Sequence, residues 1–198
     1  MNFLNKTIIL FLLTFLSCQA FALSTENITE HFSSIKNLES DFTIVRQFKE
    51  ISKKPIVSGG KLYFQKPSQV KWEQEYPEKT GLLIDNKTIY LWKYNKAGKK
   101  EVRNVSKQKF AKNMSYTIFN FLFMDIAALE KSFNIKQEED KISLRPKKDS
   151  NKTIEIYFDK DEVSVNKVVI IDEKWGTTIM SFDKTKINGN LPENAFSI

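Results

Sequence analysis

The chain has 198 residues and a formal net charge of +7 at pH 7, from 31 Lys and Arg against 24 Asp and Glu. This length predicts one domain, and the charge comes almost entirely from lysines that are spread along the chain. Nucleic-acid binding is not expected, because it needs clustered Arg and Lys with aromatic side chains on one polar face. A solvated surface, an anionic membrane surface or an acidic partner protein fits this charge better.

The first 22 residues have the pattern of a signal peptide. Lys6 precedes the apolar run Ile8–Leu16, and Ala20-Phe21-Ala22 places small residues at the two positions that a signal peptidase reads. We therefore expect cleavage after Ala22, export, and a mature domain over residues 23–198. The alternative is a lipoprotein signal with Cys18 lipidated, although Phe15-Leu16-Ser17 is a poor approach to such a cysteine. The apolar run is far shorter than the roughly 20 residues that span a bilayer.

Residues that usually carry catalysis or hold metals are scarce. Cys18 is the only cysteine and lies within the predicted signal, and His31 is the only histidine. We therefore expect no zinc site, thiol nucleophile or Ser-His-Asp triad, and the sequence contains no glycine-rich phosphate loop. Acidic residues at 138–140 and 159–162 fall in predicted hairpin turns, where solvated turn residues are the ordinary explanation and a calcium site is the alternative. The sequence predicts neither an enzyme nor a cofactor.

Hydrophobic spacing predicts one helix and then a long strand at the start of the mature chain. Apolar residues recur every three or four positions from Ile28 to Leu38, which predicts an amphipathic helix over residues 24–38. From Glu39 the period changes to two, which predicts a strand to about residue 51. One face of this strand holds Phe42, Ile44, Arg46 and Phe48.

The rest of the chain consists mainly of short segments of strand character. They are separated by turns such as Lys66-Pro67 and Asp85-Asn86. A run without alternation at 114–133 predicts one or two short helices, the second capped by Asp125. Together these parts predict a mainly β protein, with one large curved antiparallel sheet of about 10 or 11 strands, a half-barrel, and helices on its concave face. The further strands are expected at 56–65, 69–75, 81–85, 88–94, 99–105, 134–137, 141–146, 153–158, 163–171 and 177–187.

A half-barrel leaves its inner face uncovered, so the large apolar side chains on that face should line a cavity. An acyl chain needs only such a dry surface, because each buried methylene contributes roughly 0.8 kcal/mol. Plain core packing is the alternative for each of these side chains. The candidate ligand-binding residues are Phe42, Phe48, Leu62, Phe64, Val70, Trp72, Phe119, Leu122 and Ile126.

Short motifs follow one another in a specific order along the mature chain. They are Asp41-Phe42-Thr43, then Gly60-Lys61-Leu62-Tyr63-Phe64 before Lys66-Pro67, Val70-Lys71-Trp72 before Tyr76-Pro77, Ile84-Asp85-Asn86-Lys87-Thr88-Ile89 before Tyr94, and the closing Asn190-Leu191-Pro192-Glu193-Asn194-Ala195-Phe196. Taken together, this order and spacing resemble the LolA family of periplasmic lipoprotein carriers. The resemblance spans nearly all of residues 23–198.

The resemblance implies a periplasmic chaperone that takes an acylated lipoprotein from an inner-membrane release complex, shields its acyl chains and passes it to an outer-membrane acceptor. It implies no cofactor and no covalent chemistry, and we expect a monomer. Family members usually have an arginine before the proline of the Lys-Pro turn, where it ties the strand to the lid. This chain has Lys66 there, and a lysine is a point charge rather than a planar fork. Lys66 and Arg46 are the candidate latch residues.

Three alternatives remain open. The chain could carry a free lipid or acyl product to an exporter, because Arg46 with the Pro55 and Ser58-Gly59-Gly60 segment looks like a divergent branch of the family. It could instead be a periplasmic domain that senses lipids or lipoproteins. Finally, it could be an envelope adaptor whose basic face binds anionic lipid without an internal cavity.

Overall fold

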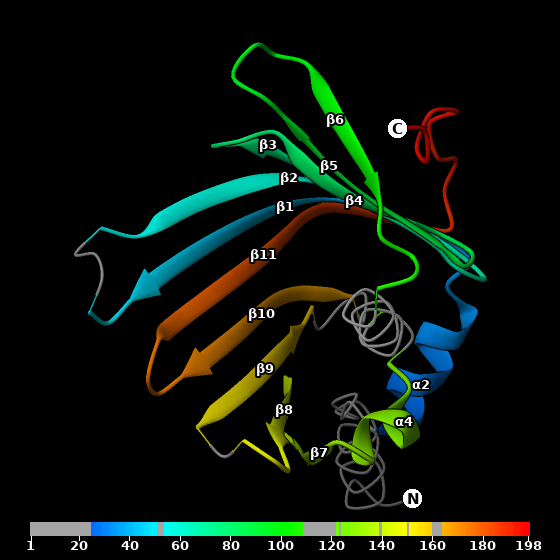
Figure 1. Cartoon of the computed structure of the whole chain (residues 1–198). Helices are drawn as coiled ribbons and strands as arrows, with labels where there is room; N and C mark the ends of the chain where they lie inside the picture. The colour runs from blue at the N-terminus through cyan, green and yellow to red at the C-terminus, as the bar shows by residue number, and fades with distance from the viewer. Residues whose placement is uncertain are drawn as a thin grey trace, which may run out of the picture.

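The computed structural model describes residues 25–50, 54–108, 122, 124–138, 140–149, 151–159 and 164–198. Within these ranges, eleven strands form one antiparallel sheet in the order β6-β5-β4-β3-β2-β1-β11-β10-β9-β8-β7. The two edge strands, β6 and β7, do not meet, so the sheet curves without closing (Figure 1). The predicted half-barrel of 10 or 11 strands is confirmed.

The strand bounds agree with the predicted segments to within about two residues, apart from the end of β1. The strands are β1 (Asn37–Phe48), β2 (Ile56–Gln65), β3 (Gln69–Tyr76), β4 (Thr80–Asp85), β5 (Thr88–Tyr94), β6 (Lys100–Asn104), β7 (Phe133–Gln137), β8 (Lys141–Pro146), β9 (Lys152–Phe158), β10 (Val165–Asp172) and β11 (Gly176–Ile187).

The first and last strands of the chain are neighbours in the middle of the sheet. Phe42 of β1 lies opposite Gly60 of β2 on one side and opposite Phe182 of β11 on the other. All other neighbouring strands follow each other directly in the sequence. The sheet therefore has two wings, β2 to β6 and β7 to β10, which join at the β1–β11 pair.

Two short helices, α2 (Thr25–Ser34) and α4 (Ile126–Glu130), lie at the same end of the sheet (Figure 1). Three apolar residues of α2, Ile28, Phe32 and Ile35 just after its end, are 0–5% exposed and form part of the core. No helix of the described ranges is long and apolar enough to cross a membrane. The helices thus pack on the sheet rather than extending from it.

The helix predicted over residues 24–38 ends earlier, at Ser34. The hydroxyls of Ser33 and Ser34 donate to the carbonyls of Glu30 and His31, and the chain then enters β1 at Asn37. The prediction of a helical Leu38 is therefore wrong, because serines that bond to their own backbone favour helix ends.

The second predicted helix is present as α4, and its predicted cap is confirmed. Ala128 N donates to Asp125 Oδ1 at 2.9 Å, as expected for an N-cap. Residues 114–121, which include Phe119, and residue 123 of the segment predicted to be helical lie outside the described residues.

Candidate functional site

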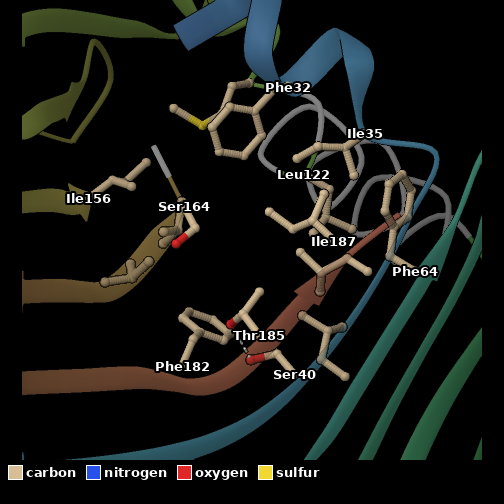
Figure 2. A pocket seen from close by; sticks show the side chains of 15 residues that line it. Phe32, Ile35, Ser40, Phe64, Leu122, Ile156, Ser164, Phe182, Thr185 and Ile187 are labelled. Carbon is tan, nitrogen blue, oxygen red and sulfur yellow. Dashed lines mark hydrogen bonds between the residues drawn. The ribbon is translucent and has the colours of Figure 1, made fainter. Parts of the chain in front are cut away.

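An apolar cavity of about 120 Å³ lies between the inner face of the sheet and α2 (Figure 2). Twelve of the fifteen residues around it are apolar, three carry hydroxyl groups, and none of the fifteen is charged. The wall consists of Phe32, Ile35, Leu38, Ser40, Leu62, Phe64, Leu122, Met124, Ile156, Ser164, Val165, Val168, Phe182, Thr185 and Ile187. Such a lining can hold a hydrocarbon, and it offers no charged group that could act on one.

Strand register brings the central part of this wall together. Leu38 of β1 pairs with Phe64 of β2 and with Ile187 of β11, so three lining side chains form one row across three strands. In the same way Ser40 lies opposite Leu62. Because side chains alternate between the two faces of a strand, the residues between them point away from the cavity.

The hydroxyl groups of the cavity floor are already satisfied. Ser40 is 1% exposed, and its Oγ lies 2.8 Å from Thr185 Oγ1 and 3.1 Å from the Asp183 carbonyl (Figure 2). A buried hydroxyl with protein partners does not require a polar ligand. The floor is therefore compatible with a purely apolar guest.

The helix α2 covers one side of the cavity and acts as its lid. Phe32 and Ile35 are part of the cavity wall, and the Phe32 ring meets the Phe158 ring edge to face with centroids 6.2 Å apart. A guest larger than the cavity has to displace these side chains. The position of α2 thus controls the space that is available.

Lys66 ties this lid to the sheet. Its ammonium group extends from the turn between β2 and β3 and donates to the carbonyl of Phe32 at 3.2 Å and to that of Ser33. These carbonyls belong to the last turn of α2, where no further helical N–H is available to them. Burial lowers the pKa of Lys66. The predicted latch role of Lys66 is consistent with this geometry and remains a proposal.

Arg46, the other candidate latch residue, lies elsewhere. It is exposed near the far end of β1, opposite Ile56 and Thr178, whereas Lys66 follows the strand position that pairs with Asn37. Nine residues of β1 therefore separate the two, about 30 Å at the rise of an extended strand. The structure does not bring Arg46 and Lys66 together.

A residue that the sequence analysis did not identify also holds the lid. Asn188, just after β11, accepts a hydrogen bond from Lys36 N at 2.6 Å and donates to the Ser34 carbonyl at 3.3 Å. Its φ of 56° lies in the left-handed region, which asparagine tolerates better than most residues. An isolated Asn-Gly pair after a predicted strand was the one signal in the sequence.

The predicted ligand-binding residues fall into separate places. Leu62, Phe64 and Leu122 are part of the cavity wall. Phe42 and Trp72 stack on each other with ring centroids 4.0 Å apart, within the core beside the cavity.

The remaining four predicted residues are not part of the cavity wall as the structure describes it. Val70 is buried in the same core, and Ile126 of α4 packs against that core. Phe48 lies at the far end of β1 opposite Gly176, and Phe119 lies outside the described residues.

The last strand supplies lining residues that the sequence analysis did not select. Phe182, Thr185 and Ile187 of β11 and Val168 of β10 are all cavity residues. The alternation in the predicted strand 177–187 was a usable signal, because it places Phe182 on the inner face. The pairing of β1 with β11 shifts register between Glu39 and Asp41, so the alternation does not continue unbroken to Thr185 and Ile187.

No three His, Cys, Asp or Glu side chains in the described ranges gather closely enough to hold a metal ion. An open antiparallel sheet with a helix over an apolar, uncharged cavity defines a β protein with an internal apolar compartment.

Comparison with known proteins identifies the family. The family model described as outer membrane lipoprotein carrier protein LolA matches residues 33–198. This chain belongs to the LolA family. A search of curated protein sequences finds no match.

Several solved structures are similar to this fold. MucB aligns with a TM-score of 0.55 at 10% identity, over 91% of this chain and 64% of MucB. The MucA/MucB complex from Pseudomonas aeruginosa gives a TM-score of 0.50 at 11% identity, over 86% of this chain and 58% of that chain. An uncharacterised conserved protein from Thermus thermophilus gives 0.52 at 13% identity, over 88% of this chain and 93% of that protein. At these identities the similarity shows the fold alone.

Proposed function

We propose that this chain is a periplasmic carrier that shields the acyl chains of lipoproteins under α2 and delivers them from the inner to the outer membrane. The observation that carries the proposal is the cavity wall, which is apolar throughout except for three hydroxyl groups. Membership of the LolA family supports lipoproteins as the cargo. In this proposal the partners are a release complex at the inner membrane and an acceptor at the outer membrane, and the carrier is a monomer without a cofactor.

The cavity has to expand when the cargo enters. Its volume of about 120 Å³ is well below the 300–1,000 Å³ that is usual for ligand pockets. The proposal assigns this movement to α2, because Phe32 of α2 and Ile35 just after it form part of the cavity wall. The burial of each methylene, roughly 0.8 kcal/mol, offsets the loss of the lid contacts. In this proposal the closed arrangement described above is the empty form of the carrier.

A second candidate function has one observation in its favour. MucB has been solved in complex with MucA, so a protein of this fold can bind a partner protein. A sensing domain that reports on lipids or lipoproteins would use the same cavity. We rank the sensor behind the carrier, together with a carrier of free lipid, because the matching family model describes a lipoprotein carrier.

Two neighbouring residues of β10 provide a matched test. Val168 is part of the cavity wall, whereas Val169 points to the outer face and lies opposite Ile179. Val168→Trp should fill the cavity, and Val169→Trp places the same side chain outside it. Binding of a fluorescent acyl probe, and co-purification of lipoproteins identified by mass spectrometry, should fall at least about tenfold for Val168→Trp alone.

The melting temperature of both variants checks that they fold. Equal binding by two folded variants would contradict an acyl site in this cavity. Free phospholipid in place of acylated lipoproteins would favour the free-lipid carrier. A partner protein whose binding is lost in Val168→Trp, without co-purification of lipoproteins by wild type, would favour the sensor.

A further inference from the structure

Exposed apolar side chains occur on several strand ends and on one turn at the end of the sheet opposite α2. We call this region the hairpin end, and it comprises Ile56, Tyr76, Ile171 and Trp175. They are exposed at 47%, 44%, 37% and 63% respectively. In Figure 1 the β1–β2 and β10–β11 hairpins extend away from α2 and α4 at this end. Neither the core nor the cavity uses these side chains.

Trp175 is the most exposed of them, and its backbone is firmly held. Asp172 Oδ1 accepts hydrogen bonds from Lys174 N and from Trp175 N at 2.9 and 3.0 Å. The Trp175 carbonyl accepts from Lys49 N, which joins the β10–β11 hairpin to β1. A large apolar ring on a fixed turn is therefore presented to solvent, although nothing in the fold requires it there.

Positively charged side chains lie at the same end of the sheet as Trp175. Arg46, Lys49, Lys54 and Lys174 lie in or beside the two hairpins, against the exposed acids Glu50 and Glu173. Beside Tyr76, the exposed Lys79 lies near the exposed acids Glu75 and Glu78. The carboxylate of Asp172 is already engaged by two backbone N–H groups and, at 3.6 Å, by Lys152. The hairpin end is thus mildly basic, within a chain whose overall formal charge is +7.

We propose that the hairpin end docks on an anionic phospholipid bilayer, with Trp175 at the level of the headgroups. Tryptophan prefers this interface because its ring is apolar while its N–H can still bond to water or headgroups. Lysines beside it are attracted to anionic headgroups. Charge complementarity selects the bilayer over a second copy of this chain, because two copies would bring like charges together.

This docking does not depend on the cargo, so it stands apart from the proposed function. A protein held by its hairpin end points α2 and the cavity away from the lipid. The lid would then remain accessible to a protein partner at the same membrane. Contact of this kind is peripheral and reversible.

The test uses the mature chain and vesicles of phosphatidylglycerol and phosphatidylethanolamine, compared with vesicles of phosphatidylcholine. Trp92 is 3% exposed and Trp72 packs in the core, so quenching by brominated lipids should report mainly on Trp175. Trp175→Ser should lower binding to the anionic vesicles about tenfold and abolish the quenching. The matched control Ile198→Ser removes an apolar side chain that is 43% exposed on the C-terminal segment, and it should bind as the wild type does.

Salt should weaken the binding, and phosphatidylcholine vesicles should bind less. Unchanged binding by a folded Trp175→Ser would overturn the proposal, as would equal losses in both variants. Sedimentation velocity tests whether a second copy of this chain binds to the hairpin end instead. Self-association that requires Trp175, without any binding to vesicles, would show that a second copy and not a bilayer covers this end.

Discussion

A single lysine carries much of the connection between lid and sheet. Lys66 is the donor to two carbonyl groups at the end of α2, and the same carbonyls have no other partner inside the helix. An arginine could make these bonds with two fixed N–H groups, whereas a lysine makes them with a rotating ammonium group. The hydrogen bonds that Lys66 makes to the end of α2 should therefore break more readily than those of an arginine at the same position.

Lys66→Ala should loosen α2, because it removes the donor for the Phe32 and Ser33 carbonyls. We expect a loss of about 1 kcal/mol in the local stability of α2, visible as faster hydrogen exchange of its amides. Acyl probe should also exchange faster. Lys66→Arg should restore slow exchange.

Lys36→Ala is the control for this prediction, since Lys36 is an exposed lysine in the same connection. It should leave the exchange of α2 unchanged. Equal exchange in Lys66→Ala and wild type would mean that apolar packing alone holds the lid.

His31 gives the lid helix a dependence on pH. Burial lowers the pKa of His31, and within the described part of the chain its Nε2 is buried without a hydrogen-bond partner. Below about pH 6.5 the unfolded chain therefore binds more protons than the folded chain, so the free energy of unfolding falls as the pH falls. Urea unfolding at pH 7.5 and pH 5.5 should show a larger loss for wild type than for His31→Gln. Equal losses would show that other groups set the pH dependence.

Among the elements, β2 depends on a close approach at Gly60. A Cβ at this position would lie 1.9 Å from the Glu73 carbonyl oxygen of β3, which is a backbone atom that cannot rotate away. Gly60→Ala should therefore lower the free energy of unfolding by about 2 kcal/mol. Gly189→Ala is the control, because the nearest neighbouring atom would lie 4.0 Å from its Cβ. Urea unfolding measures both, and equal stabilities would mean that β3 shifts freely to make room.

The elements themselves could largely be predicted from the sequence, and the contacts between distant elements could not. Alternation located the strands because each has one face toward the core, as Phe42 and Ile44 show in β1. The end of α2 was missed because Leu38 continues the helical spacing although it belongs to β1. The bond from Asn188 to Ser34 joins residues 154 positions apart, and no local pattern reports such a distance.

The candidate site was predicted only in part for the same reason. Leu62, Phe64 and Leu122 were identified as large apolar residues of segments expected at the inner face, but the wall also needs Phe182 and Ile187. These residues join the wall only because β11 pairs with β1. Strand order is a property of the folded sheet, and one sequence does not contain it explicitly.

At the scale of the molecule, the two wings should unfold together. The apolar core includes Phe64 and Ile84 from the β2–β6 wing and Ile142 and Ile156 from the other wing, so neither wing has a core of its own. We therefore expect a single calorimetric transition whose enthalpy equals the van't Hoff enthalpy. A ligand at 100 times its Kd should raise the free energy of unfolding by about 2.7 kcal/mol without splitting the transition. Two separate transitions would contradict a shared core.

The position of β11 has a consequence for the order in which the molecule becomes able to bind. A ribosome makes this strand last, yet it lies between β1 and β10 in the sheet. Before β11 is made, β1 has an unpaired edge, and the cavity wall lacks Phe182, Thr185 and Ile187. A chain that ends before β11 should therefore lack part of the proposed acyl site.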